Sequence, residues 1–197
     1  WRGLWIEAQP SYCESARRAF AKPLAEGRLE LLETRVTAEN IDRLIAGARV
    51  AAAGELDLLS IDIDGNDYHV FRAIESVRPR VVVIEYNAKY PPPMDLVPSY
   101  DPDLSWDGSD YMGASLQAIT NLAARRGYRL VGTNITGVNA FFVRADLAAD
   151  RFAEGEAAAF YNPARYWLSD GLSAGHPPGV RFGYLSDAAL EQALKSK

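Results

Sequence analysis

Short apolar runs alternate with segments of helical periodicity along the first half of the chain. Apolar runs at residues 4–6, 29–36, 56–63 and 81–86 predict β-strands, and each of the first three leads into a helical pattern. Thr37 is the expected N-cap of the second helix. Repeated strand–helix–strand units predict an α/β fold with a mostly parallel sheet. The expected inward helical faces comprise Cys13, Ala16, Phe20 and Leu24; Ile41, Leu44, Ile45 and Ala48; and Val70, Phe71 and Ile74.

The periodicity stops between residues 87 and 113, where proline and aspartate are frequent. A structureless stretch of this length is uncommon inside a compact domain and is typical of a lid or binding loop. Its aromatic side chains could stack on a sugar or ring substrate, or they could anchor the loop to the body of the protein. The sequence leaves both interpretations open for Tyr90, Tyr100, Trp106 and Tyr111.

Helical spacing returns over residues 114–126 and ends at Gly127, a typical C-cap residue. Two strand-like runs, 128–131 and 140–143, flank a turn-rich segment and predict an antiparallel hairpin. We therefore expect an α/β domain over residues 1–146 and an extension over 147–197 that packs on the core or on a partner. The extension is too aromatic to be disordered, as it contains Phe160, Tyr161, Tyr166, Trp167, Phe182 and Tyr184.

Composition narrows the classes of partner. The formal net charge is −5 and basic residues form no long cluster, which argues against a nucleic-acid interface. The single cysteine excludes a disulfide framework and favours a reducing compartment. Because no apolar run is long enough for a membrane span, we expect a cytoplasmic protein. Trp1 already lies in an apolar segment, so we expect that an upstream segment is missing.

The third strand ends in the most informative pattern, LDLLSIDIDGND, which spans residues 56–67. Alternation along a strand would place Asp62 and Asp64 on one face, and Gly65 allows a sharp turn at the sheet edge where α/β proteins bind ligands. Asp64 alone could equally be a helix N-cap. Glu85 ends the next strand, so Asp62, Asp64 and Glu85 could meet around one pocket. They could ligate Mg²⁺, Mn²⁺ or Ca²⁺, or one of them could act as a general base.

Several segments together resemble the FkbM-type S-adenosylmethionine-dependent methyltransferases: WRGLWIEAQP, RVTAENI, LLSIDIDGNDYHVFRAI, RVVVIEYNA, GYRLVG and GVNAFFVR. The resemblance extends from Trp1 to about Arg144. It implies a Rossmann-like class I methyltransferase sheet that binds S-adenosylmethionine. It further implies that Glu7 receives the cofactor ribose hydroxyls and that Asp62 lies beside the methionine part. The family's glycine-rich loop would lie upstream of Trp1.

The resemblance makes an O-methyltransferase acting on a hydroxyl of a saccharide or polyhydroxylated metabolite the expected function. Asp64 or Glu85 is the expected base, and His69 has at most a minor role. One alternative is a metal-dependent glycosyltransferase that uses the Asp-x-Asp strand end, and another is a noncatalytic interaction module. A haloacid-dehalogenase-like phosphatase fits less well, since no later Asp-Asp pair follows the motif. The sequence leaves the oligomeric state open.

Overall fold

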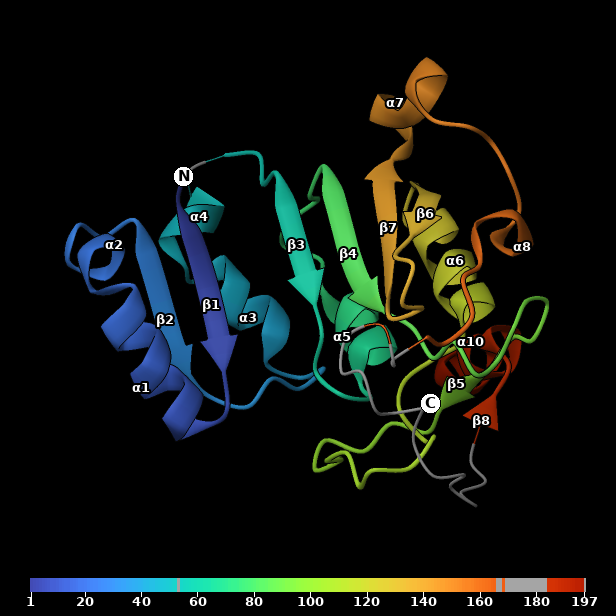
Figure 1. Ribbon diagram of the computed structural model, residues 1–197, viewed down its shortest axis with the longest axis horizontal. Helices are drawn as coiled ribbons and strands as arrows, with labels where there is room; N and C mark the ends of the chain where they lie inside the picture. Colours follow the sequence, from blue (N-terminus) through green and yellow to red (C-terminus); the bar gives the residue numbers. More distant parts are fainter. Residues whose placement is uncertain (53, 166–167, 169–183, 197) are drawn as a thin grey trace. The chain divides into compact units, whose positions relative to one another are not determined.

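The computed structural model describes residues 1–52, 54–165, 168 and 184–196 (Figure 1). The chain divides into two compact units. The first comprises Trp1–Leu56 with Val70–Pro79, and the second comprises Asp57–His69 with Arg80–Lys197. Both units combine helices with sheet, which agrees with the predicted α/β class.

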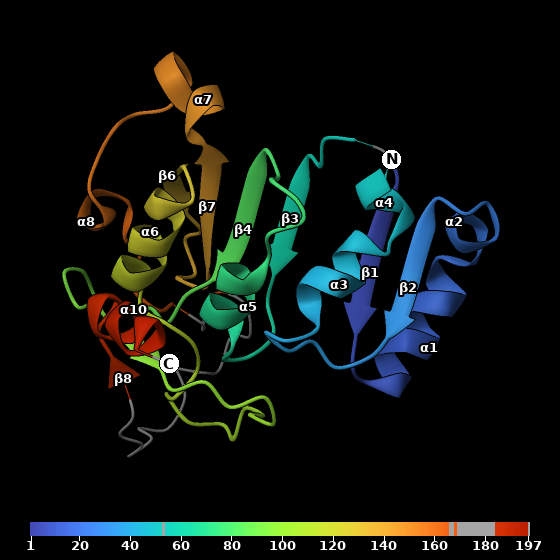
Figure 2. The same cartoon turned by 180° about the vertical axis from the view of Figure 1, so that it is seen from behind.

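The first unit contains a two-stranded parallel sheet with helices on both faces (Figures 1 and 2). The two strands run in register from Gly3, opposite Leu29, to Glu7, opposite Glu33. Each predicted strand is present, although the second is shorter than the sequence pattern indicates. The elements are β1 (Gly3–Glu7), α1 (Pro10–Ala19), α2 (Ala21–Ala25), β2 (Leu29–Glu33), α3 (Ile41–Ala46) and α4 (Arg49–Ala52).

Local chemistry decides where these helices begin. Pro10 occupies the first turn of α1, where its missing N–H costs nothing and its fixed φ suits the helix. Cys13 is fully buried on the inner face of that helix. The prediction of Thr37 as an N-cap is wrong, because α3 begins only at Ile41. The Thr37 amide instead donates to the Asn40 side chain at 2.9 Å, which forms a turn before the helix.

The second unit is built on a four-stranded mixed sheet in the order β3-β4-β7-β6 (Figure 1). β3 and β4 pair in parallel, whereas β7 is antiparallel to both β4 and β6. The predicted hairpin is therefore confirmed, and its second strand lies between β4 and its own hairpin partner. The strands are β3 (Leu58–Ile61), β4 (Val81–Glu85), β6 (Tyr128–Thr133) and β7 (Asn139–Arg144).

Two helices of this unit are held together by a partly buried ionic network. α6 (Leu116–Arg125) begins at the N-cap Ser115, whose hydroxyl accepts from the Ala118 amide. At the other end of α6, Arg125 makes two hydrogen bonds to Asp187 at the start of α10 (Asp187–Lys195). The Tyr68 hydroxyl, on α5 (Asp67–Ala73), also donates to Asp187. These bonds attach α10 to the body of the unit.

Most aromatic side chains of the loop at residues 87–113 anchor it by packing. The rings of Tyr90 and Tyr111 lie 5.1 and 4.9 Å from that of Tyr184, and Tyr100 lies 5.1 Å from the His69 ring. Trp106 differs, because 43% of it is exposed. Within this region β5 (Val97–Pro98) pairs with β8 (Tyr184–Leu185).

The segment after β7 contains α7 (Ala145–Ala148), a 3-10 turn (Ala149–Arg151) and α8 (Ala157–Phe160). After α8, the Tyr161 hydroxyl donates to the Ala88 carbonyl at 2.6 Å. Three aromatic residues of the predicted extension, Tyr166, Trp167 and Phe182, lie outside the described residues, and the boundary at residue 146 stays a prediction. In the described part of the chain, the helices lack the length and apolar character needed to cross a bilayer.

Candidate functional site

The turn after β3 is the local structure that carries two of the predicted site residues. β3 ends at Ile61, so the prediction of a strand through Ile63 is wrong, and strand alternation does not place Asp62 and Asp64. Asp64 instead adopts a left-handed conformation with φ of 58°, followed by Gly65 with φ of 139°. Aspartate tolerates the left-handed region better than most residues, and glycine enters such conformations without steric cost.

A buried carboxylate that the sequence interpretation missed fixes this turn. Asp67, the first residue of α5, is fully buried, and its side chain accepts from the amides of Ile63 and Gly65, each at 3.0 Å. Burial raises the pKa of Asp67 to about 6, against the opposing effect of these hydrogen bonds. The available signal was an aspartate directly at a helix start after a glycine turn, where acidic side chains are favoured.

The loop at residues 87–113 contacts the same turn. A Cβ atom added at Gly65 would lie 2.7 Å from Cδ2 of Leu104. The φ of residue 65 would also be strained for any residue other than glycine. The next side chain, Asn66, donates to the carbonyl of Asp101 at 2.8 Å. Only glycine therefore fits the turn without rearrangement of the loop.

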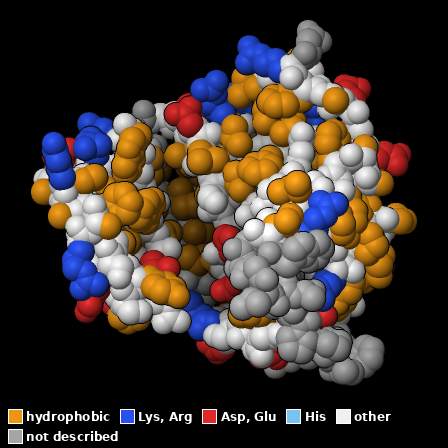
Figure 3. Space-filling view, viewed as in Figure 1, with side chains coloured by type: hydrophobic (Ala, Val, Ile, Leu, Met, Phe, Trp, Pro, Cys, Tyr) orange, Lys and Arg blue, Asp and Glu red, His pale blue; other side chains and the backbone are white. Residues whose placement is uncertain are grey.

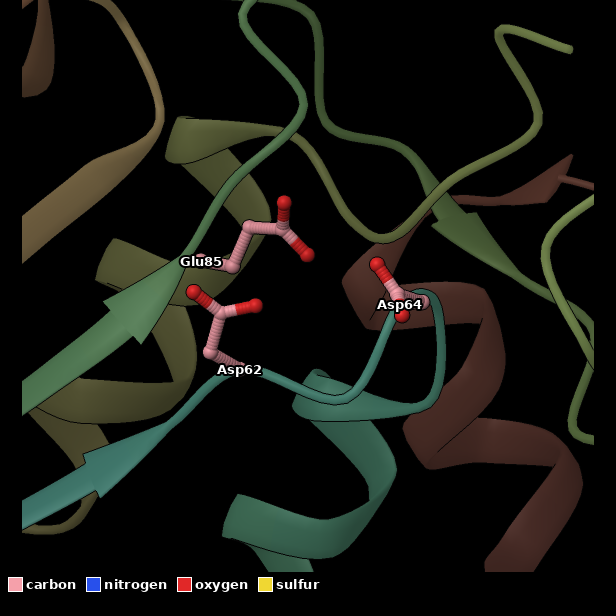
Figure 4. A group of neighbouring side chains, drawn as sticks. All are labelled: Asp62, Asp64 and Glu85. Atoms are coloured by element: carbon pink, nitrogen blue, oxygen red, sulfur yellow. The ribbon is translucent and has the colours of Figure 1, made fainter. Parts of the chain in front are cut away.

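The register of β3 and β4 places the third predicted acid beside the first. Ile61 pairs with Ile84, so Asp62, the first residue after β3, lies at the same level as Glu85, the last residue of β4. One carboxylate oxygen from each of Asp62, Asp64 and Glu85 lies within 4.8 Å of the other two. Figure 4 shows Glu85 at the end of β4 facing Asp62 and the turn that carries Asp64. The structure thus brings three of the four predicted site residues together.

The environments of these acids differ. Asp62 and Asp64 are exposed, whereas only 6% of Glu85 is exposed and its Oε2 atom has no hydrogen-bond partner among the described residues. Desolvation raises the pKa of Glu85 to about 9, and the neighbouring Asp67, Asp62 and Asp64 add to the effect. Desolvation and the Asp64 charge also raise the pKa of Asp62. The group can hold a proton or a cation, and an ionised Glu85 would be a strong base.

Glu7 belongs to the first unit and lines a different feature, an open hollow of about 310 Å³. Its carboxylate accepts from the Gln9 amide at 2.6 Å. The hollow includes two partly exposed aromatic side chains, Trp5 and Tyr12, neither of which the sequence interpretation proposed as a site residue. Figure 3 shows hydrophobic side chains gathered on this unit over β1 and β2. A carboxylate beside aromatic rings suits a nucleoside, because the carboxylate can accept from a diol while the rings contact the base.

Glu33 provides a useful contrast to Glu7, since the two glutamates end paired strands opposite each other. Glu33 forms an ion pair with Arg17 at 2.8 Å. The Glu33 carboxylate is therefore paired with Arg17, whereas the Glu7 carboxylate lines the hollow.

His69 packs against the loop at residues 87–113. It is buried, and its Nε2 lies 2.8 Å from the carbonyl oxygen of Pro98. The ring also contacts Tyr100. These contacts give His69 a role in holding the loop.

Comparison with protein families decides between the classes of enzyme. A family model, the methyltransferase FkbM domain, matches residues 14–130, which is more than half of the chain. The chain belongs to the FkbM methyltransferase family. The searches of curated proteins and of solved structures give no match. The FkbM match includes Asp62, Asp64, Asp67 and Glu85 and begins after Glu7. Membership favours a methyltransferase over the glycosyltransferase and phosphatase alternatives.

Proposed function

We propose that this FkbM-family protein is an S-adenosylmethionine-dependent O-methyltransferase that acts on a hydroxyl of a saccharide or another polyhydroxylated metabolite. Family membership supports methyl transfer. The observation that carries the oxygen acceptor is the buried Glu85 carboxyl, which lies with Asp62 and Asp64 in one acidic group and whose Oε2 has no hydrogen-bond partner among the described residues. Carboxylates accept hydrogen bonds from hydroxyls and, when suitably basic, accept their protons.

The residues around Glu7 fit the adenosine part of the proposed cofactor. S-adenosylmethionine, when bound, supplies a methyl group activated on a sulfonium centre. In the hollow, Glu7 would accept hydrogen bonds from the two ribose hydroxyls, and Trp5 and Tyr12 would contact the adenine ring. The family resemblance assigns Asp62 to the methionine end, where a carboxylate suits the ammonium group.

Asp64 and Glu85 are the proposed catalytic residues. A hydroxyl needs its proton removed as its oxygen attacks, and the enzyme must hold that oxygen in line with the methyl group. A carboxyl with a raised pKa is the stronger base once ionised, which favours Glu85 as proton acceptor. Asp64, which lies close to Glu85, would orient the same hydroxyl or accept the proton itself.

The proposal includes a small-molecule acceptor, no nucleic-acid partner and a cytoplasmic location. The acidic net charge supports the exclusion of nucleic acid, which requires a basic surface. The single cysteine, Cys13, is free and buried, which fits a reducing compartment.

Calorimetric titration of S-adenosylhomocysteine into the full-length protein tests the cofactor assignment. We expect wild type to bind and Glu7→Gln to bind at least about tenfold more weakly. The neutral amide of glutamine accepts weaker hydrogen bonds from the ribose hydroxyls than the charged carboxylate does. Glu33→Gln is the matched control, since it removes the carboxylate at the same level of the neighbouring strand. Its affinity should equal that of wild type.

Two results would count against the proposal. Absence of binding by the wild-type protein would remove the cofactor and with it the proposed reaction. Equal weakening in Glu7→Gln and Glu33→Gln would indicate a general effect on the first unit rather than a ribose contact at Glu7.

A further inference from the structure

The acidic group after β3 and β4 has the dimensions of a cation site. Carboxylate oxygens lie about 2.1 Å from Mg²⁺ and up to about 2.6 Å from Ca²⁺, so two oxygens that share one such cation are at most about 4–5 Å apart. One carboxylate oxygen from each of Asp62, Asp64 and Glu85 lies within 4.8 Å of the other two. Their side chains point toward a common space in Figure 4.

A second observation points to a ligand in that space. Glu85 is more than nine-tenths buried, yet its Oε2 atom is unpaired within the described part of the chain. A buried acceptor that is left without a partner destabilises the folded protein, and more strongly when it is charged. The charged side chains that act on Glu85 are Asp67, Asp62 and Asp64, all of them acidic. The local structure therefore gathers negative charge around the Glu85 carboxyl group.

The surrounding structure holds this arrangement in place. The β3–β4 register fixes Asp62 beside Glu85, and the two backbone hydrogen bonds of Asp67 fix the turn that presents Asp64. Ligands that are positioned before binding lose little entropy when the cation arrives.

We propose that Asp62, Asp64 and Glu85 bind one divalent cation of the Mg²⁺ or Mn²⁺ type. All three ligands offer oxygen, which hard cations prefer. Because Asp62 and Asp64 are exposed, the cation would keep positions open toward solvent. This inference deepens the proposed function and rests on it for one point only: those open positions would receive the hydroxyl oxygens of the acceptor and orient the one to be methylated. A hydroxyl bound to the cation would lose its proton more readily, so a carboxylate that also binds the cation could still accept that proton.

The test is titration of Mn²⁺ into the full-length protein after treatment with a chelator, with free Mn²⁺ followed by electron paramagnetic resonance. We expect one saturable site that Mg²⁺ displaces. Glu85→Gln keeps the shape of the side chain but loses the charge, and its affinity should fall by more than the roughly 10–100-fold that outer-shell changes produce. The control Asp57→Asn removes an exposed carboxylate that pairs with Arg80 in the same unit, and it should bind as wild type does.

Thermal unfolding provides a second measurement that separates lost binding from lost folding. Mn²⁺ should raise the Tm of wild type and Asp57→Asn but not that of Glu85→Gln, which should itself unfold cooperatively. Absence of Mn²⁺ binding by wild type would overturn the inference. Unchanged affinity in Glu85→Gln would overturn it as well.

The inference and the proposed function fail differently. Methyl transfer that persists in excess chelator, with no Mn²⁺ bound, would overturn the cation site and leave the O-methyltransferase intact. Mn²⁺ binding that depends on Glu85, in a protein that binds no S-adenosylhomocysteine, would support the site and overturn the proposed function.

Discussion

Two buried carboxyl groups in the same unit, Asp67 at the start of α5 and Glu85 at the end of β4, have opposite environments. Both oxygens of Asp67 accept backbone hydrogen bonds, from Ile63 and Gly65. Glu85 is buried to a similar degree, but its Oε2 atom has no partner among the described residues. Burial raises the pKa of Asp67 to about 6 and that of Glu85 to about 9.

The difference separates a structural acid from a functional one. A buried acid whose hydrogen bonds are satisfied stabilises its surroundings, while one left unsatisfied costs stability that natural proteins retain mainly at sites of function. We therefore assign Asp67 to the turn and propose Glu85 for chemistry. Each of the following changes tests that division.

The largest expected effect is on turnover. Asp64→Gly removes a proposed catalytic carboxylate at a position whose φ of 58° suits glycine. Methyl transfer should fall about 100-fold or more, the usual range for loss of a proton-transfer group. The free energy of unfolding, measured with urea, should change by less than about 1 kcal/mol. Wild-type turnover in this variant would exclude Asp64 from the reaction.

Asp67→Ala should act mainly on stability. It leaves the amides of Ile63 and Gly65 without their acceptor, and an unsatisfied buried donor costs about 1–3 kcal/mol. Urea denaturation measures the loss in the free energy of unfolding. The control is Asp57→Ala at an exposed position, which should lower that free energy by about 0.5 kcal/mol or less. Equal stability of the two variants would show that Asp67 does not stabilise the turn.

The pH dependence of stability isolates Glu85. Its pKa rises from 4.5 in the unfolded chain to about 9 in the folded protein, so between these values the unfolded state binds fewer protons. Wild type therefore loses stability relative to Glu85→Gln as the pH rises from about 5 to 9, by at most about 1.4 kcal/mol per pH unit. Urea titrations of chelator-treated protein should show the gap widening with pH. A constant gap would contradict the raised pKa.

Tyr68→Phe should have the smallest effect. It removes one hydrogen bond from Asp187, a third buried acid, which keeps its bonds to Arg125. We expect a loss of about 0.5–1.5 kcal/mol in stability and wild-type turnover. A large loss of turnover would mean that the attachment of α10 controls the active site.

Much of the architecture follows from the sequence because it depends on local periodicity. Apolar spacing and turn residues predict the strands that end at Glu7 and Glu85, the helix over Leu116–Arg125 and the hairpin of β6 and β7. The meeting of Asp62 with Glu85 follows from topology, since neighbouring parallel strands end at one edge.

The remaining features depend on contacts that spacing does not encode. The left-handed conformation of Asp64 and the hydrogen bonds of Asp67 arise in an irregular turn, where the hydrophobic pattern gives no information. Tyr12 reaches the hollow of Glu7 from α1, and this requires the packing of helix on strand. The position of β7 between β4 and β6 depends on tertiary packing, because a hairpin pattern does not indicate which of its two strands pairs with the rest of the sheet.

Methyl transfer by the full-length protein to a panel of saccharides and polyols, with wild type, Glu85→Gln and Asp57→Asn compared side by side, tests the central claim most directly. The account predicts an O-methylated product from wild type and Asp57→Asn. For Glu85→Gln it predicts a rate reduced by about 100-fold or more, with unchanged binding of S-adenosylhomocysteine. Equal rates for all three proteins would contradict it.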